Sequence, residues 1–225
     1  MKWKQRKADR PTLEGHRRYF MERNSIQAFE SRVIYLEHLF EIQQVMHRYL
    51  HYFSLLEGDK MTNLFSQKAN DISIEVGDSG VFEGKEGIER FHKPFNAMAN
   101  QVGVYIEHTV ASPMIEVARD GATAKVVWFS PGHISSGKNN LQCWSWWKIG
   151  GEFIKEEEIW KIWHLHFYQT FECRVEKGWL YEQEVPLLGT RRIPPWYPPD
   201  QPTTYHMPYA PHKRNYFIPE PPKPY

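Results

Sequence analysis

The chain has 225 residues, a formal net charge of +1 at pH 7, and aromatic side chains at 15 % of its positions. This length suits one domain with extensions or a small pair of domains, and the balanced charge gives no reason to expect nucleic acid or an acidic membrane as a partner. The two cysteines, Cys143 and Cys173, are too few for the disulfide framework of a secreted domain, although one bridge between neighbouring strands stays open.

The first twenty residues hold no apolar run after their basic residues, so they do not read as a signal peptide. No stretch approaches the ~20 apolar residues that span a bilayer. We therefore expect a soluble, cytoplasmic protein without a membrane segment.

Helical spacing follows an N-terminal arm, residues 1–34, which is basic and polar and is predicted to hold a short helix at 18–31. Apolar residues recur every three or four positions over 35–57, which predicts an amphipathic helix with Gly58 as its C-cap. Shorter helices are expected at 60–65 and 85–100. The apolar stripe of the first long helix is Leu39, Ile42, Met46, Tyr49, Phe53 and Leu56, widened by Leu36, Leu50 and Tyr52.

Strands are predicted at 71–76, 102–117 and 122–130, followed by a long aromatic hairpin over 141–174. Strict alternation would place Trp160, Ile162, His164, His166, Tyr168 and Thr170 on one face of the last strand, and Ile159, Trp163, Leu165 and Phe167 on the other. A strand that only fills a core rarely carries His-x-His-x-Tyr, because each of these rings has a polar atom that needs a partner. This row is the main sequence clue to function.

The chain changes character beyond Gly178. Twelve of its sixteen prolines lie between Pro186 and Pro224, and such a segment cannot join a sheet. It is too aromatic for a disordered tail. We expect residues 179–225 to form a strap across their own or a neighbouring subunit.

The order of these elements resembles the nuclear transport factor 2 (NTF2) superfamily, and more narrowly its SnoaL-like and scytalone-dehydratase-like branch. The resemblance covers roughly residues 35–175, within a domain predicted at 35–178. It rests on four stretches: YLHYFSLLEGDKMTNLFSQKAND (49–71), VFEGKEGIERFH (81–92), IEHTVASPMIEVARDGATAKV (106–126) and GGEFIKEEEIWKIWHLHFY (150–168). It implies an α+β cone in which a curved antiparallel sheet wraps around helices and encloses a pocket.

Enzymes of this branch are mostly cofactor-free lyases, isomerases or cyclases that use His, Tyr and Asp as acids and bases. The resemblance implies that His108 is a pocket histidine and that Trp128 faces the cavity. Leu56 stands where many relatives have an aspartate at the end of the first helix, so the general base has to be a His, Tyr or Lys side chain. The last strand and the proline-rich tail are also similar to lignin-dimer lyases that release formaldehyde without a cofactor.

The candidate site combines the histidines and tyrosines of the elements expected to face the cone. A neutral imidazole in a dry pocket has a pKa near working pH and can take or return a proton. For any single histidine the alternative is a satisfied core or interface position, and for any tyrosine it is core packing. The predicted catalytic residues are Tyr52, His108, His164 and His51, and the predicted substrate-binding residues are Tyr49, Trp128, His133, Trp160, His166 and Tyr168.

Metal and cofactor sites are not expected. His164 and His166 have a spacing that can chelate zinc or iron, and His108 or His133 could complete a site. No Asp or Glu stands in obvious partnership with them, and relatives of this kind are usually metal-free. No nucleotide-binding or serine-hydrolase motif is present either.

The prediction is therefore a cofactor-independent lyase for a phenolic aromatic small molecule, acting by dehydration, by carbon–carbon cleavage that releases formaldehyde, or both. The alternatives are a non-catalytic ligand-binding or assembly module with the same cone, and an isomerase or cyclase that uses the same pocket. The aromatic outer face of the last strands further predicts a homodimer or a higher homo-oligomer.

Overall fold

The computed structural model describes residues 26–184, 197–215 and 218–223. The chain divides into two compact units, Met1–His38 and Leu39–Tyr225. The predicted arm at 1–34 lies mostly outside the described residues, and the predicted boundaries of the domain and strap stay predictions.

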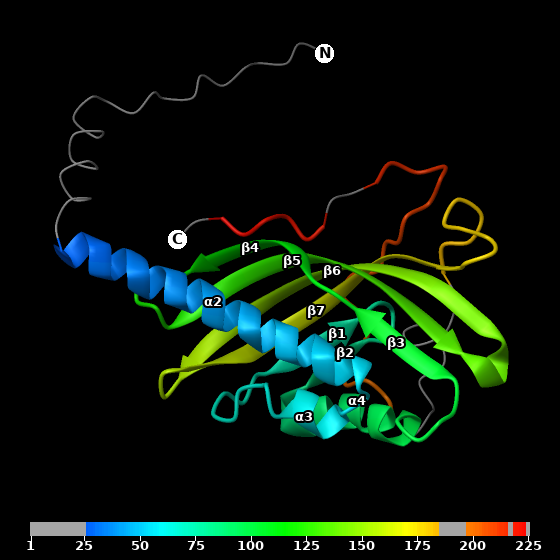
Figure 1. The fold of residues 1–225 in the computed structure, drawn as a ribbon, viewed down its shortest axis with the longest axis horizontal. Coiled ribbons are helices and arrows are strands. Elements are labelled where there is room, and N and C mark those ends of the chain that lie inside the picture. Colours follow the sequence, from blue (N-terminus) through cyan, green and yellow to red (C-terminus); the bar gives the residue numbers. More distant parts are fainter. Residues whose placement is uncertain (1–25, 185–196, 216–217, 224–225) are drawn as a thin grey trace, which may run out of the picture. The chain divides into compact units, whose positions relative to one another are not determined.

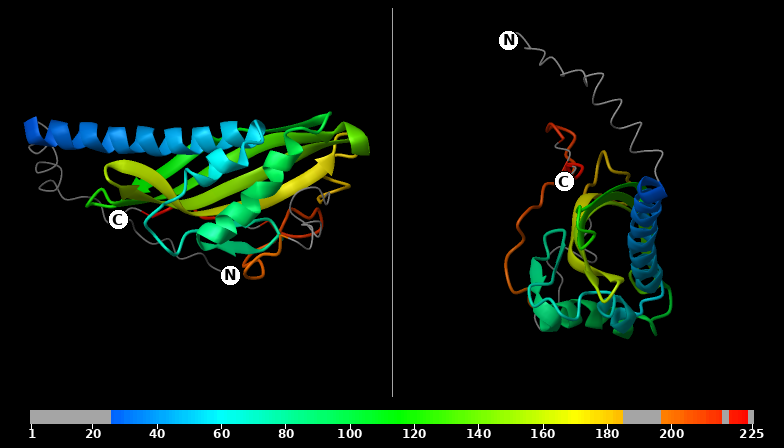
Figure 2. Two further views of the ribbon diagram at one scale, coloured as in Figure 1. Left: turned by 90° about the horizontal axis from the view of Figure 1, so that it is seen from below. Right: turned by 90° about the vertical axis from the view of Figure 1, so that its left-hand side faces the viewer.

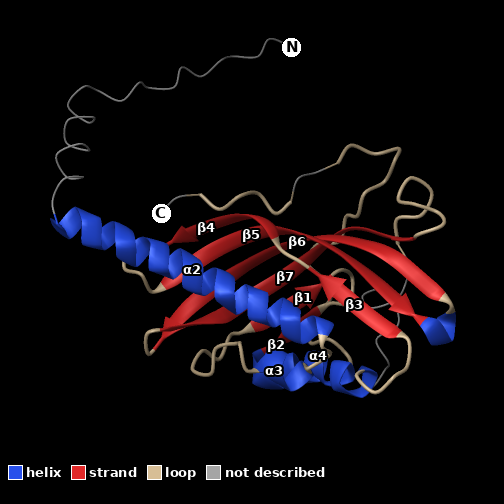
Figure 3. Ribbon diagram, in the orientation of Figure 1, coloured by secondary structure: helices blue, strands red, loops and turns tan. Residues whose placement is uncertain are grey.

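Three helices stand among the described elements (Figures 1 and 3). They are α2 (Ile26–Ser54), α3 (Gly58–Thr62) and α4 (Gly84–Met98). Helix α2 begins well before the predicted residue 35, because the preceding residues contain no Pro or Gly to interrupt it. It ends at Ser54, and the left-handed residue in the turn that follows is Leu56 (φ 58°). The predicted C-cap, Gly58, is instead the first residue of α3.

The strands form one seven-stranded sheet. They are β1 (Ser73–Val76), β2 (Val81–Glu83), β3 (Val104–His108), β4 (Ala111–Val117), β5 (Thr123–Ser136), β6 (Leu141–Glu156) and β7 (Ile159–Arg174), and a short 3₁₀ helix, η1 (Gly137–Asn139), joins β5 to β6. The order is β2-β1-β7-β6-β5-β3, with β4 also paired to β5. All pairings are antiparallel except β1 with β7. The long strands β5, β6 and β7 curve together, as Figure 2 shows.

The core of Leu39–Tyr225 lies between the concave face of this sheet and the second half of α2. From α2 it takes Ile42, Val45, Met46, Tyr49 and Leu50, and from the long strands it takes Val126, Trp128, Ile149, Phe153, Trp160, Ile162 and Leu165. No helix in the described residues is long and apolar enough to cross a membrane. The α+β fold with a curved sheet, as expected from the sequence, is confirmed.

A β-bulge changes the faces of the last strand. The register between β6 and β7 shifts from Phe153 opposite Ile162 to Glu152 opposite His164, which leaves Trp163 as the extra residue. An inserted residue inverts the alternation beyond it. Ile162 and Leu165 therefore both join the core, and the single predicted face that carried Ile162 with His164 is wrong.

Candidate active site

A partly enclosed cavity lies under the sheet, within the unit Leu39–Tyr225. Helices α2 and α4 and five of the strands line it with Tyr49, Leu50, Phe53, Val76, Phe91, Phe95, His108, Ile134, Trp147 and Phe167. The space between these atoms is about 490 Å³ with open solvent included, and about 40 Å³ of it is open to the centre of a water molecule. As it stands the cavity holds a few waters, not a two-ring ligand.

The helical repeat explains how the lining residues reach the cavity. On α2, Tyr49 and Phe53 are four residues apart, so they lie one turn above the other on the same face. On α4, His92 follows Ile88 by four residues and joins Phe91 and Phe95 on the buried face. Gly58 lets α3 approach closely, since a Cβ there would lie 2.3 Å from the carbonyl oxygen of His92.

A directed chain of hydrogen bonds starts at the cavity wall. The hydroxyl of Thr62 donates to the carbonyl of Gly58 (3.2 Å), so its oxygen is the acceptor for Nδ1–H of His92 (3.0 Å). Nε2 of His92 is then the acceptor for the hydroxyl of Tyr49 (3.0 Å). This chain fixes the tautomer of His92 and holds the Tyr49 oxygen at the cavity with its lone pairs still able to accept a hydrogen bond.

Burial keeps both members of this pair neutral. It lowers the pKa of the His92 imidazole to about 3, against which the Ile88 carbonyl acts only weakly. Burial also raises the pKa of Tyr49 well above its usual value. At neutral pH the pair is therefore a phenol bonded to a neutral imidazole.

His108 stands at the end of β3, and its imidazole lines the cavity. Its Nδ1 lies 3.2 Å from the hydroxyl oxygen of Ser130, and a hydrogen bond to the backbone of Ser130 also favours a proton on this ring. A proton on Nδ1 leaves the Nε2 lone pair as the proton acceptor. Burial lowers the pKa of His108 to about 4, so the ring is neutral at pH 7. Gly132 makes room for it, since a Cβ there would lie 2.4 Å from Cγ of His108.

A buried carboxyl group supports another part of the wall. The indole N–H of Trp147 donates to the hydroxyl of Ser145, which donates in turn to Glu172 (3.2 Å). Burial raises the pKa of Glu172 to about 8, although the bond from Ser145 acts in the opposite direction. This network orients the Trp147 ring that lines the cavity.

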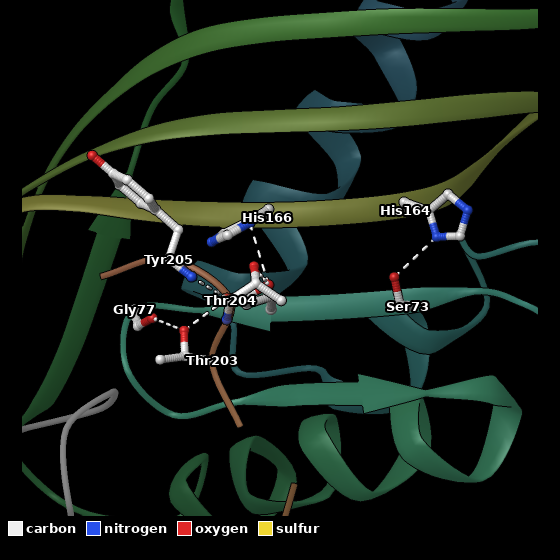
Figure 4. Close-up of polar contacts among 8 residues, drawn as sticks. Ser73, Gly77, His164, His166, Thr203, Thr204 and Tyr205 are labelled. Atoms are coloured by element: carbon white, nitrogen blue, oxygen red, sulfur yellow. Dashed lines mark hydrogen bonds and ion pairs between the residues drawn. The ribbon is translucent and has the colours of Figure 1, made fainter. Parts of the chain in front are cut away.

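The His-x-His-x-Tyr row lies on the other face of the sheet. His164, His166 and Tyr168 line a separate, more open groove together with Pro219 and Pro222, and the space between its atoms is about 820 Å³ with open solvent included, larger than the cavity. Figure 4 shows His164 bonded to Ser73 (Nδ1 to Oγ, 2.9 Å) and His166 beside the strand that carries Glu75. The bulge at Trp163 sets this orientation, so the expectation that these side chains face the cavity is wrong.

The remaining predicted residues also lie outside the cavity lining. His51 is exposed on α2, because it is turned by about 160° from both Tyr49 and Phe53 around the helix. Tyr52 lies about 60° from Tyr49 and about 100° from Phe53, and is partly buried beneath Lys60 (Nζ to ring centroid 5.5 Å). His133 points outward beside Glu107 (3.7 Å). Trp128 and Trp160 are buried in the core, 1 % and 2 % exposed, so Trp128 does not face the cavity as the resemblance implied. Of the predicted site residues, the structure brings only Tyr49 and His108 to the cavity.

His92, which hydrogen-bonds Tyr49 from behind the cavity lining, is the residue that the sequence did not reveal. The apolar repeat Ile88, Phe91 and Phe95 passes through it, and a histidine inside such a repeat is a signal that it faces inward. The described residues contain no cluster of three or more His, Cys, Asp or Glu side chains placed to hold a metal ion. The paired histidines of β7 have polar partners of their own, Ser73 and Glu75.

This fold and cavity define an α+β protein of the NTF2-like class. Residues 35–166 match the SnoaL-like domain, so the chain belongs to that family. The resemblance drawn from the sequence is thereby confirmed. Among curated proteins, none matches the chain significantly.

Solved structures agree on the fold. A protein of Novosphingobium aromaticivorans, provisionally described as a scytalone dehydratase, is 12 % identical with a TM-score of 0.53, covering 61 % of this chain and 87 % of its own. The hexachlorocyclohexane dehydrochlorinase LinA-type3 of Novosphingobium barchaimii is 13 % identical with a TM-score of 0.54, covering 69 % and 99 %. At such identities the likeness concerns the fold alone.

Proposed function

We propose that the protein is a cofactor-independent lyase whose active site is the cavity under the sheet. One observation carries this proposal. The neutral imidazole of His108 lines a cavity that is otherwise mostly apolar, and a second neutral imidazole, His92, hydrogen-bonds the lining residue Tyr49 from behind. Acid–base groups placed in a dry pocket suit proton removal and elimination. The similar structures include one described as a dehydratase and one described as a dehydrochlorinase, and both names denote eliminations.

The proposed substrate is a phenolic aromatic molecule of the kind derived from lignin. Aromatic walls favour a flat apolar ligand through burial of its surface. The Tyr49 hydroxyl would turn from His92 and give its proton to the benzylic hydroxyl, which departs as water. The para-phenol of the substrate loses its proton, which returns to Tyr49, and supplies the electrons that form a quinone methide. His108 would then accept the proton of the neighbouring primary alcohol. The carbon–carbon bond breaks, formaldehyde leaves, and the bonding electrons form the alkene and restore the phenolate ring.

The balance of this sequence needs no oxidant or reductant. A 1,2-diarylpropane-1,3-diol gives a stilbene, formaldehyde and water. The phenol serves as the electron sink that a cofactor supplies in other enzymes. Since the cavity is smaller than such a substrate, Phe53, Phe91 or Phe95 has to turn aside to admit it.

The experiment incubates the metal-stripped protein with a phenolic 1,2-diarylpropane-1,3-diol and follows stilbene absorbance and formaldehyde together. Equimolar appearance of both supports the deformylating lyase. Absorbance without formaldehyde supports dehydration alone. Absence of both products over a panel of phenolic diols contradicts the proposal.

A binding module is the second candidate. The small volume and the apolar lining favour it, since they suit retention of a ligand as well as its conversion. Saturable binding of a phenol without turnover would support this reading. An isomerase or cyclase would use the same two groups and would differ in its substrate.

A further inference from the structure

Helix α2 carries a second apolar stripe in its first half. Its members follow the alternating three- and four-residue spacing of a coiled-coil seam. They are Ile26, Phe29, Val33, Leu36 and Phe40, with exposed fractions of 78, 63, 37, 60 and 63 %. At about 100° per residue, all five fall within a sector of about 80° around the helix.

This stripe faces away from the side of the helix that builds the core. The core residues of the second half, from Ile42 to Phe53, centre about 150° further around the same helix axis. The stripe is therefore a second apolar face of the helix, distinct from the face that carries the core residues.

We propose that this stripe pairs with the same stripe of a second copy of the chain, as a parallel two-stranded coiled coil. In heptad terms Ile26, Val33 and Phe40 take the a positions, and Phe29 and Leu36 take the d positions. A β-branched residue at a, as at Ile26 and Val33, with leucine at d favours two strands over three or four. The apolar stripe can pack against an identical stripe, and a second copy of the chain supplies one.

The charges beside the stripe select the parallel orientation. Glu30 and Glu37 take the e positions on one flank, and Arg32 takes a g position on the other. In a parallel pair, Arg32 of each helix faces Glu37 of its partner, so both flanks carry opposite charges. In an antiparallel pair e positions face e positions, which sets glutamate against glutamate.

The seam covers only about two heptads, and helices this short associate weakly when alone. The full-length protein should therefore be measured by sedimentation equilibrium over about 1–300 µM. A concentration-dependent monomer–dimer equilibrium is expected. The double variant V33E/L36E should weaken it at least ~tenfold, since each dimer would then bury four carboxylates in its seam.

The matched control is Ile34→Glu, because Ile34 is also half-exposed on α2 but lies about 120° from the stripe centre. It should leave the dimer constant unchanged within about twofold. Circular dichroism of all variants establishes that the fold is retained. A monomer at all concentrations, or a dimer whose constant V33E/L36E leaves unchanged, would overturn the proposal and in the second case point to the outer sheet face.

Orientation is tested independently. Glu37→Arg alone should weaken the parallel dimer, and R32E/E37R should restore it, whereas E37R would strengthen an antiparallel pair. Ile26→Cys should give a disulfide-linked dimer on mild oxidation, because two a positions meet only in the parallel form. Strengthening by E37R, or no cross-link through position 26, would contradict the parallel arrangement.

Discussion

Glu75 fastens the C-terminal segment to the sheet, and its removal gives a worked prediction. The carboxylate accepts hydrogen bonds from the Thr203 hydroxyl (2.7 Å), from N–H and hydroxyl of Thr204 (2.6 and 2.7 Å) and from Tyr205 N–H (3.3 Å). Figure 4 shows these strap residues gathered beside His166. Burial acts to raise the pKa of Glu75, but these bonds and His166 outweigh it and lower the pKa.

Glu75→Gln removes the charge and one acceptor oxygen. Bonds to a charged group contribute roughly 1 kcal/mol more than neutral ones, which over the three short bonds is about 3 kcal/mol. A neutral amide at this buried position, 6 % exposed, recovers part of the desolvation cost. The expected loss of unfolding free energy at pH 7 is therefore about 2 kcal/mol.

Urea unfolding at pH 7 and at lower pH measures this loss. Because the pKa of Glu75 is lowered on folding, its contribution is complete above the unfolded pKa near 4.5 and is lost as pH falls through the folded value. The difference in unfolding free energy between wild type and Glu75→Gln should then disappear on acidification. The control Glu152→Gln, at a carboxylate with 38 % of its side chain exposed, should change stability by less than about 0.5 kcal/mol. If the two proteins unfold with the same free energy at pH 7, or if their difference does not depend on pH, the Glu75 carboxylate does not stabilise the fold in this way.

Three further predictions concern the cavity. Tyr49→Phe leaves Nε2 of His92 without its donor and should cost about 1–3 kcal/mol in urea unfolding; no loss would mean that this bond does not form. Folding lowers the pKa of His92, so the unfolded chain binds more protons than the folded chain as the pH falls below about 6.5. The unfolding free energy should therefore fall by about 2 kcal/mol between pH 7 and pH 5 because of His92 alone. His92→Gln should flatten that slope, and an equally steep variant would contradict the assignment. Gly132→Ala should displace the His108 ring and reduce turnover, because the added Cβ would overlap that ring. The control Gly137→Ala should leave turnover unchanged, since its Cβ would make only ordinary van der Waals contacts. Equal turnover in both variants would show that Gly132 is not needed to make room for His108.

The fold could be predicted from the sequence because its signals are local and ordered along the chain. Helical spacing from Leu39 onward located the core half of α2, and the long hairpin was visible from its aromatic alternation. The beginning of α2 was not, since the exposed stripe before Leu39 follows a different face of the helix. Family membership followed from the order of the elements.

The site was harder to predict, because one inserted residue decides it. Strict alternation predicts His164 and Ile162 on the same face of the strand. The sequence does not identify Trp163 as the bulged residue that puts them on opposite faces. His108 was found through the resemblance. His92 was missed because a histidine within an apolar helical repeat reads first as a satisfied core residue.

The choice between the two faces of the sheet is also the most direct test of the proposed active site. Turnover of the phenolic diol should be compared in wild type, His108→Gln in the cavity, and the same substitution at His164 in the outer groove. We predict that His108→Gln lowers kcat/KM by about 10²-fold or more, the usual effect of losing a general base, and that His164→Gln stays within about twofold. Full activity in His108→Gln, or loss of activity in His164→Gln alone, would contradict the assignment of the cavity under the sheet as the active site.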